Sequence, residues 1–247
     1  MNNQDIDSLE RATLDAVAPL ALEELPGWLL PFDRSSVNRA ISAVPLSHNG
    51  FPADGVAEIA ARYASKGLGT QFRIADVPGL QRLQAALAQQ GYRAHHPTWT
   101  MTARLRQLAA LPLAASNGRV SISQQPSKEW ESVYLASEFD PKDAASRVQA
   151  LSRSNCTSYA WIGDASGALA AGTASMSRGW ASFHGLRTLH RVRRQGLAQA
   201  LLAALCQQAL AAQLENCFLQ VEEDNAPAIN LYQRLGFQTA WRYRYWR

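Results

Sequence analysis

The most chemically informative segment of the chain is a basic, glycine-containing turn between an apolar strand pattern at 180–189 and an Ala/Leu-rich helix pattern at 197–213. A turn that opens a helix presents unpaired backbone N–H groups and the positive end of the helix dipole, which together bind anions such as a pyrophosphate. Gly196 would let the backbone approach the phosphates without interference from a Cβ. Further N–H groups would come from Arg194, Gln195, Leu197 and Ala198.

A second informative segment, residues 225–237, follows one predicted helix and one predicted strand later. Asn225 fits a helix N-cap, Pro227 falls in the permissive first turn, and Gly236 fits the position just after the helix. The segment therefore predicts a short helix that begins close to the end of the strand at 217–222.

Together the two segments resemble the acetyl-CoA signature of the GCN5-related N-acetyltransferases, the GNAT family. The matching residues are Arg193-x-x-Gly196-x-Ala198, followed by Asn225-x-x-Ala228-x-x-Leu231-Tyr232-x-x-x-Gly236-Phe237. The predicted order of elements over 118–247, β-α-α-β-β-β-α-β-α-β, is also similar to the GNAT order. The resemblance implies an α/β (α+β) acyl-CoA N-acyltransferase fold, with a mixed central sheet flanked by helices.

The elements behind this order follow from periodicity and from turn residues. We expect strands at 119–123, 158–163, 169–175, 180–189, 217–222 and 237–247, and helices at 128–137, 142–153, 197–213 and 225–236.

The resemblance also implies how acetyl-CoA is held. Arg193 would support the loop and the phosphates, and pantetheine would lie where the strand at 180–189 parts from that at 217–222. Leu189 would contact the pantetheine through its backbone, with its N–H as the oxyanion donor to the thioester carbonyl. Asn225 would reach the amide arm of the co-substrate besides capping its helix.

Tyr232 is the candidate general acid, because the motif places its hydroxyl near the sulfur of the co-substrate. Taken alone, without the motif, Tyr232 would sooner be interpreted as a packed aromatic residue on an amphipathic helix. A phenol with a pKa near ~10 holds its proton at neutral pH and can pass it to a departing thiolate in a concerted step. The base is open between His184 on the strand before the loop and Glu222 at the end of the other strand. Each also has a purely structural interpretation, as a half-buried strand histidine and as one carboxylate among several.

The first half of the chain is less regular. Strands are expected at 27–32, 39–45, 70–74 and 98–105, and helices at 53–66 and 80–90. We interpret residues 1–112 as a degenerate GNAT-like module, joined by a linker at 111–118 to a catalytic module at 118–247, as in two-module bacterial acetyltransferases. The segment 46–54 offers no Arg-x-x-Gly-x-Ala pattern, so this half is expected to have a structural or acceptor-lining role.

Composition limits the class of protein. Among the 247 residues 47% are hydrophobic and 18% charged, which is typical of a folded, soluble protein. No apolar run reaches the length of a membrane span, and no signal peptide is evident. The three cysteines match neither a metal site nor a disulfide scaffold, so a reducing cytoplasm is expected and no metal. The net charge of +4 includes an arginine cluster at 187–194, for which we favour a small polyanionic ligand over nucleic acid.

The sequence thus predicts an N-acetyltransferase that transfers an acetyl group from acetyl-CoA, as co-substrate, to a primary amine by direct attack. The acceptor is a small molecule or a peptide, nucleic acid and membrane are not expected as partners, and a homodimer stays open. The alternative is a non-catalytic acyl-CoA-binding sensor or regulator with the same fold.

Overall fold

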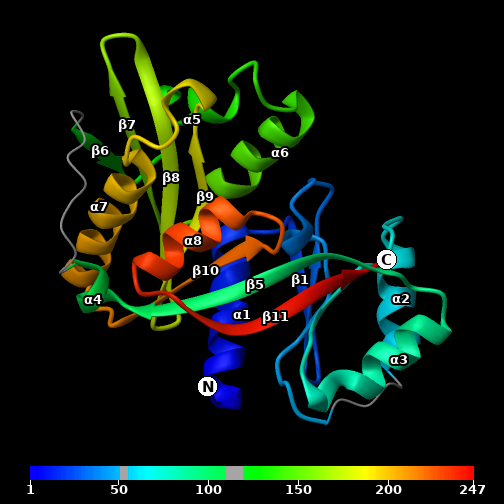
Figure 1. Ribbon diagram of the computed structural model, residues 1–247. Coiled ribbons are helices and arrows are strands. Elements are labelled where there is room, and N and C mark those ends of the chain that lie inside the picture. Colours follow the sequence, from blue (N-terminus) through cyan, green and yellow to red (C-terminus); the bar gives the residue numbers. More distant parts are fainter. Residues whose placement is uncertain (51–54, 110–118) are drawn as a thin grey trace.

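The computed structural model describes residues 1–50, 55–109 and 119–247, which form a three-stranded sheet, an eight-stranded sheet and the helices around them (Figure 1). The small sheet has the order β1-β2-β3, and the large sheet has the order β4-β11-β5-β10-β9-β8-β7-β6. The strands are β1 (Ala21–Leu25), β2 (Trp28–Phe32), β3 (Val44–Pro45), β4 (Phe72–Ala75), β5 (Ala94–Arg104), β6 (Val120–Ser123), β7 (Thr157–Asp164), β8 (Gly167–Ser177), β9 (Trp180–Thr188), β10 (Asn216–Glu222) and β11 (Gln238–Trp246).

The α-helices are α1 (Asn3–Val17), α2 (Gly55–Ser65), α3 (Gln81–Gln89), α4 (Leu105–Ala109), α5 (Lys128–Tyr134), α6 (Pro141–Ser152), α7 (Leu197–Ala211) and α8 (Ala226–Arg234). Short 3-10 helices are η1 (Asn38–Ala40), η2 (Pro78–Leu80) and η3 (His190–Val192). From β6 to β11 the order is the predicted one, and the large sheet is mixed, because β9 and β10 are parallel while the neighbouring pairs are antiparallel.

The two halves of the chain share the large sheet. β5, from the first half, lies between β10 and β11 and runs antiparallel to both, and β4 pairs with the outer edge of β11 (Figure 1). A division of the chain at 112–118 therefore does not separate one sheet from another. The linker expected at 111–118 lies within 110–118, outside the described residues.

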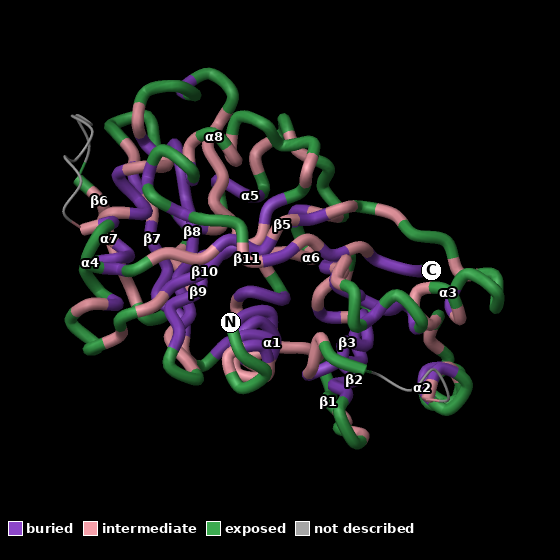
Figure 2. The backbone as a smooth tube through the Cα atoms, turned by 60° about the horizontal axis from the view of Figure 1, so that its bottom comes forward, coloured by how far each residue is buried: buried purple, intermediate pink, exposed green. Residues whose placement is uncertain are grey.

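Helices cover both faces of the sheet. On one face, α7 packs Leu201 and Leu205 into a core that includes Ala170 and Ala174 of β8. On the other face, α5 packs Trp130 against β8, where the indole Nε1 donates to the carbonyl oxygen of Gly172 (3.2 Å). The strands between these layers are buried along much of their length (Figure 2).

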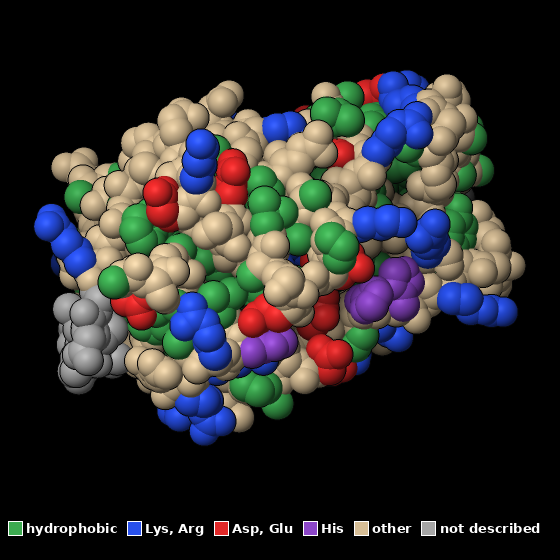
Figure 3. All heavy atoms as spheres, turned by 90° about the horizontal axis from the view of Figure 1, so that it is seen from above, with side chains coloured by type: hydrophobic (Ala, Val, Ile, Leu, Met, Phe, Trp, Pro, Cys, Tyr) green, Lys and Arg blue, Asp and Glu red, His purple; other side chains and the backbone are tan. Residues whose placement is uncertain are grey.

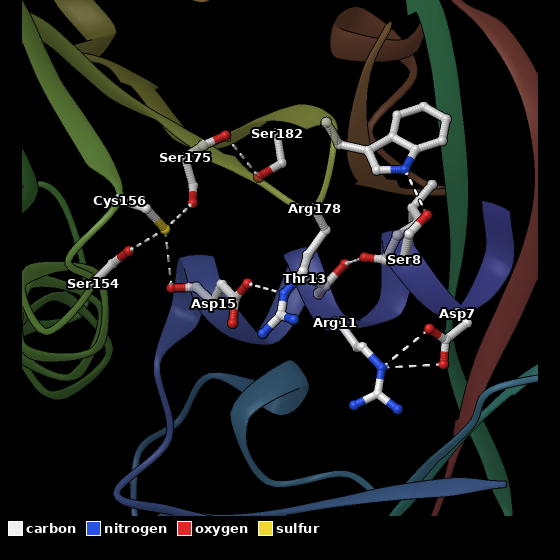
Figure 4. A network of polar contacts seen from close by, with 12 residues as sticks. Asp7, Ser8, Arg11, Thr13, Asp15, Ser154, Cys156, Ser175, Arg178 and Ser182 are labelled. Carbon is white, nitrogen blue, oxygen red and sulfur yellow. Dashed lines mark hydrogen bonds and ion pairs between the residues drawn. The ribbon is translucent and has the colours of Figure 1, made fainter. Parts of the chain in front are cut away.

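Helix α1 was not expected from the sequence, although its N-terminus carries a readable capping box. The side chain of Asn2 accepts a hydrogen bond from the backbone N–H of Asp5, and the side chain of Asp5 accepts one from the backbone N–H of Asn2. Figure 4 shows α1 lying against β8 and β9, linked to them by polar contacts. Among these contacts, Arg178 Nε donates to Asp15 (2.9 Å) and Trp180 Nε1 donates to Ser8 Oγ (2.9 Å). The helix thereby joins the start of the chain to the middle of the large sheet.

The strand expected at 39–45 is wrong for its first part, which forms η1, and only Val44 and Pro45 belong to a strand. Ser42 Oγ donates to the carbonyl oxygen of Asn38 (2.5 Å). Such a local side-chain bond offers the backbone an alternative to a strand ladder. The turn brings Arg39 towards the large sheet, where it faces the same cavity as residues of β9, β10 and β11.

Candidate active site

The two central strands of the large sheet separate along their length, as the resemblance implied. β9 and β10 pair in parallel from Trp180–Asn216 to Phe183–Leu219, and no pairing continues beyond Leu219. At the same point β9 has a β-bulge against β8. One residue of β8 lies between Ala171 and Thr173, while two residues of β9 lie between their partners, Arg187 and His184. A bulge bends its strand and is common beside active sites.

Gly185 forms the bulge, with a φ of 61° that favours glycine. Tyr134 Oη donates to its carbonyl oxygen (2.6 Å), so that α5 is tied to β9 at the point where the strands part. Neither Tyr134 nor Gly185 was predicted from the sequence to be a site residue. A glycine inside a strand pattern was the available signal for Gly185.

A cavity of about 270 Å³ opens where the strands part. Its wall comes from both halves of the chain: η1 and the residues before it, β5, α6, β9, β10, α8 and β11. The lining residues with ionisable side chains are Arg39, Arg147, His184, Arg187, Glu222, Tyr232, Tyr243 and Tyr245.

The turn after β9 has the backbone shape of an anion site. Arg194 (φ 66°) and Gly196 (φ 79°) both adopt left-handed backbone conformations, and Gly196 is the N-cap residue of α7. Gly196 has no side chain that could cap this helix start, so the first N–H groups of α7 lack the usual N-cap acceptor. Successive N–H groups in such a turn form a concave anion site at the positive end of the helix.

Of the side chains around this turn, the polar ones are exposed and Leu197 is buried. Arg193, Arg194 and Gln195 are exposed, and neither of these arginines has a hydrogen-bond or ion-pair partner for its guanidinium among the described residues. Leu197 is buried in the core and anchors the start of α7, while Ala198 is partly exposed. The turn therefore offers free cations beside its N–H groups.

Leu189 does not offer the N–H expected of it. That N–H donates to the carbonyl oxygen of Leu169 (2.9 Å), so the prediction that Leu189 supplies the oxyanion donor is not supported. Asn225 is the N-cap of α8, where its Oδ1 accepts from the N–H of Ala228 (3.3 Å), and it also lines the cavity.

Tyr232 lies on α8 with only 9% of its surface exposed, packed against Phe237 and lining the cavity. Burial raises the pKa of its phenol to about 12, so the hydroxyl holds its proton throughout the neutral range.

The two candidate bases line the same cavity from opposite strands. His184 on β9 is 3% exposed and meets the ring of Phe218 edge-on, and its Nε2 has no hydrogen-bond partner. Burial, and then the charge of Arg39, lowers the pKa of His184 well below its usual range, so the imidazole is neutral. Glu222 is exposed at the end of β10, across from Thr98 of β5. Arg39 and Gln220 also line the cavity; neither was predicted from the sequence, because only the fold brings them to this wall.

Charge on the outer surface is mixed. On the face that Figure 3 shows, Lys and Arg side chains lie in separate groups interleaved with Asp and Glu. Within the described residues, no helix is long and apolar enough to cross a membrane, and no group of three or more His, Cys, Asp or Glu side chains is placed to hold a metal ion.

Solved structures identify the class of this fold. A GCN5-related N-acetyltransferase from Kribbella flavida is 17% identical, with a TM-score of 0.70 and coverage of 97% of this chain and 94% of that chain. A tandem GNAT protein from the clavulanic acid biosynthesis pathway, without AcCoA, is 15% identical, with a TM-score of 0.62 and coverage of 100% and 96%. The parted strands and the helix start beside them thus belong to a GNAT fold.

Sequence comparisons identify the family. The curated "Uncharacterized N-acetyltransferase YobR" of Bacillus subtilis (strain 168) is 25% identical over 243 residues, 98% of each chain. The family model described as "Probable histone acetyltransferase Rv0428c C-terminal" matches residues 3–246, both halves together. The chain belongs to this family, and it is an acyltransferase of the GNAT N-acetyltransferase type.

Proposed function

We propose that the protein transfers an acetyl group from acetyl-CoA to a primary amine by direct attack, with both substrates bound at once. The observation that carries this proposal is the uncapped start of α7 beside strands that part into a cavity lined by a protonated tyrosine.

In this proposal the pyrophosphate lies on the turn at 193–198. Backbone N–H groups from Gly196 to Ala198 bind its oxygens, and the unpaired guanidinium groups of Arg193 and Arg194 balance its charge. The pantetheine arm lies between β9 and β10 beyond Leu219, where neither strand satisfies the other. The side chain of Asn225 faces this arm from the start of α8. The N–H of Leu189 is bonded to Leu169, so in this proposal another N–H group of β9, beyond its last pair with β10, donates to the thioester oxygen.

The acceptor nitrogen must lose a proton before it attacks. An alkyl amine with a pKa near ~10.4 is mostly protonated at pH 7, and removing that proton costs about 4–5 kcal/mol. His184 is neutral and can accept a hydrogen bond through Nε2, but its lowered pKa makes it a transient acceptor at most. The exposed carboxylate of Glu222 can pass the proton to solvent, so we infer a relay from the amine towards the cavity mouth.

The attack then forms the C–N bond and breaks the C–S bond. The departing thiolate takes the proton of the Tyr232 hydroxyl, and solvent restores the phenol. The first half of the chain would line the acceptor side of the cavity through residues 36–39 and Thr98, without binding the donor.

The test is to incubate the purified protein with acetyl-CoA and a panel of amines, and to detect acetylated product by mass spectrometry. Titration calorimetry with acetyl-CoA is run in parallel and is expected to give one site per chain. Binding without any acetylated product would favour the sensor alternative, and two sites of similar affinity would contradict the assignment of donor binding to the second half alone. Glu222→Gln should lower kcat if the carboxylate is in the relay, and an unchanged kcat would exclude Glu222 from it.

A further inference from the structure

One cation in the acceptor side of the cavity has no counter-charge. Arg39 lies in η1 and lines the cavity, and its Nε is buried without a hydrogen-bond partner. Among the described residues no carboxylate forms an ion pair with it. An unpaired charge at a partly buried position is unfavourable unless a ligand or solvent satisfies it.

The other two arginines of the lining share one carboxylate, that of Asp143. Arg147 Nε donates to Asp143 (2.7 Å), and a guanidinium nitrogen of Arg187 lies 3.5 Å from the same carboxylate. Arg187 also lies over the ring of Phe139, 4.1 Å from its centroid. Among the described arginines of the lining, Arg39 is therefore the one without a carboxylate partner.

The positive charge of Arg39 acts on two other side chains of the cavity, His184 and Tyr245. Its charge helps to lower the pKa of His184 and opposes the effect of burial on the pKa of Tyr245. These three side chains line the same cavity, so an anion beside Arg39 would lie close to the histidine that faces the parted strands.

Two further side chains of the lining have buried polar atoms without partners. They are His184, through Nε2, and Gln220, through both atoms of its amide. Gln220 and Phe218 point to the same face of β10, and Phe218 contacts His184, so the unpaired groups gather on one face of the sheet. Buried polar groups are normally hydrogen-bonded, and a polar ligand would satisfy these three at once.

We propose that the acceptor is a small amine that also carries a carboxylate, with the guanidinium of Arg39 binding the carboxylate and the side chains of His184 and Gln220 facing the amine. This inference rests on the proposed function and names its substrate class. A planar guanidinium binds a carboxylate through two parallel hydrogen bonds. The cavity of about 270 Å³ suits a molecule the size of a free amino acid, whereas a lysine-rich peptide would bring further cations to an uncompensated arginine.

The experiment compares matched amines that differ only at the anionic group. Amino acids, their amides, the corresponding decarboxylated amines, aminoalkylphosphonates and a lysine-rich peptide are each assayed with acetyl-CoA. A hydrogen-bonded charge pair corresponds to about a 10–100-fold effect, so kcat/KM for an amino acid should exceed that for its amide by this factor. Equal rates for acids and amides, preference for the phosphonates, or preference for the peptide would each overturn the inference.

Substitution then locates the effect. Arg39→Gln should raise KM for the amino acid by about the same 10–100-fold while changing little for the decarboxylated amine, and Arg39→Lys should restore part of the loss. Arg34→Gln, at an exposed arginine of the same segment, is the matched control. It should leave KM unchanged for both the amino acid and the decarboxylated amine. A uniform loss for all amines in Arg39→Gln would mean that Arg39 has a structural role only.

A binding readout separates this inference from the proposed function. In the presence of coenzyme A, amino acids should raise the Tm of the wild-type protein more than their amides do, and Arg39→Gln should abolish the difference. Carboxylate-dependent stabilisation without acetylation would contradict the proposed reaction but support the anion site. Acetylation without any carboxylate preference would support the proposed reaction but contradict the anion site.

Discussion

Tyr134 donates a hydrogen bond of 2.6 Å to the carbonyl oxygen of Gly185, at the residue where β9 bulges. The bond crosses from α5 to the sheet and lies where β9 stops pairing with β10. The helix therefore holds the shape of the opening in which the proposed reaction takes place.

The first prediction tests this contact. In Gly185→Ala the new Cβ would lie 2.7 Å from Tyr134 Oη and 2.9 Å from Leu151 Cδ1, on a backbone with φ 61°. We expect a loss of about 1–3 kcal/mol in the free energy of unfolding and weaker acetyl-CoA binding. Tyr134→Phe should cost about 1 kcal/mol. Because the phenol oxygen is the nearest atom, the double variant should lose less than the sum, as measured by urea unfolding, and strict additivity would contradict this account.

The second prediction concerns the glycine at the start of α7. Gly196→Asp places a Cβ and a negative charge where the pyrophosphate is proposed to lie, so acetyl-CoA affinity in calorimetry should fall at least about 100-fold. Gly179→Asp is a matched control, because Gly179 has the same φ of 79° but lies in the turn between β8 and β9. Both variants should lose similar stability. Equal acetyl-CoA affinity in the two would exclude the turn as the anion site.

The third prediction concerns the proton donor. Tyr232→Phe keeps the ring packed against Phe237 and removes only the hydroxyl, so kcat should fall by about 10²–10⁴-fold with little change in acetyl-CoA affinity. The alkaline limb of the rate profile should also shift, because it would no longer report a phenol with a pKa of about 12. Tyr159→Phe removes a buried phenol that donates to Leu151 in the core, and it should leave kcat unchanged. An unchanged kcat in Tyr232→Phe would make that residue a packing residue.

The fourth prediction is a loss of stability in acid that depends on His48. Burial, and then the charge of Arg73, lowers the pKa of His48 to about 4, whereas the unfolded histidine titrates near ~6.5. The unfolded chain therefore binds the extra proton between these values, so stability is complete above pH ~6.5 and falls towards pH ~4, with a slope of about 1.4 kcal/mol per pH unit. The pKa of His184 is lowered as well, so His48→Gln should make this part of the Tm profile less steep without flattening it. His96→Gln, at an exposed position, should not, and equal slopes in the two variants would contradict the assignment.

The fifth prediction follows from the shared sheet. A fragment that begins near residue 117 lacks β5, which leaves the facing edges of β10 and β11 unpaired and apolar surface exposed. We expect this fragment to be insoluble or inactive. A chain cleaved within 110–118 but containing both parts should remain folded and active, as judged by gel filtration and activity. A soluble, active short fragment would contradict the prediction.

The sequence predicted the order of elements from β6 to β11 because each carries its own periodicity and turn residues. Gly196 and Asn225 were found for the same reason, since a helix start is a local signal. The insertion of β5 between β10 and β11 could not be predicted, because strand pairing across more than a hundred residues leaves no local pattern. Arg39 was not predicted as a site residue for the same reason, because its segment reaches the cavity through tertiary packing, which leaves no local pattern in the sequence.

The central position of β5 has a consequence for how the chain is made. During synthesis β5 emerges more than a hundred residues before either of its neighbours, β10 and β11. Both edges of β5 therefore lack their native partners until β10 and β11 have been synthesised. Pairings of such large sequence separation form slowly and expose strand edges to aggregation in the meantime. The large sheet is thus expected to be completed only after β11 has been synthesised, and its folding to be sensitive to chaperones that shield strand edges.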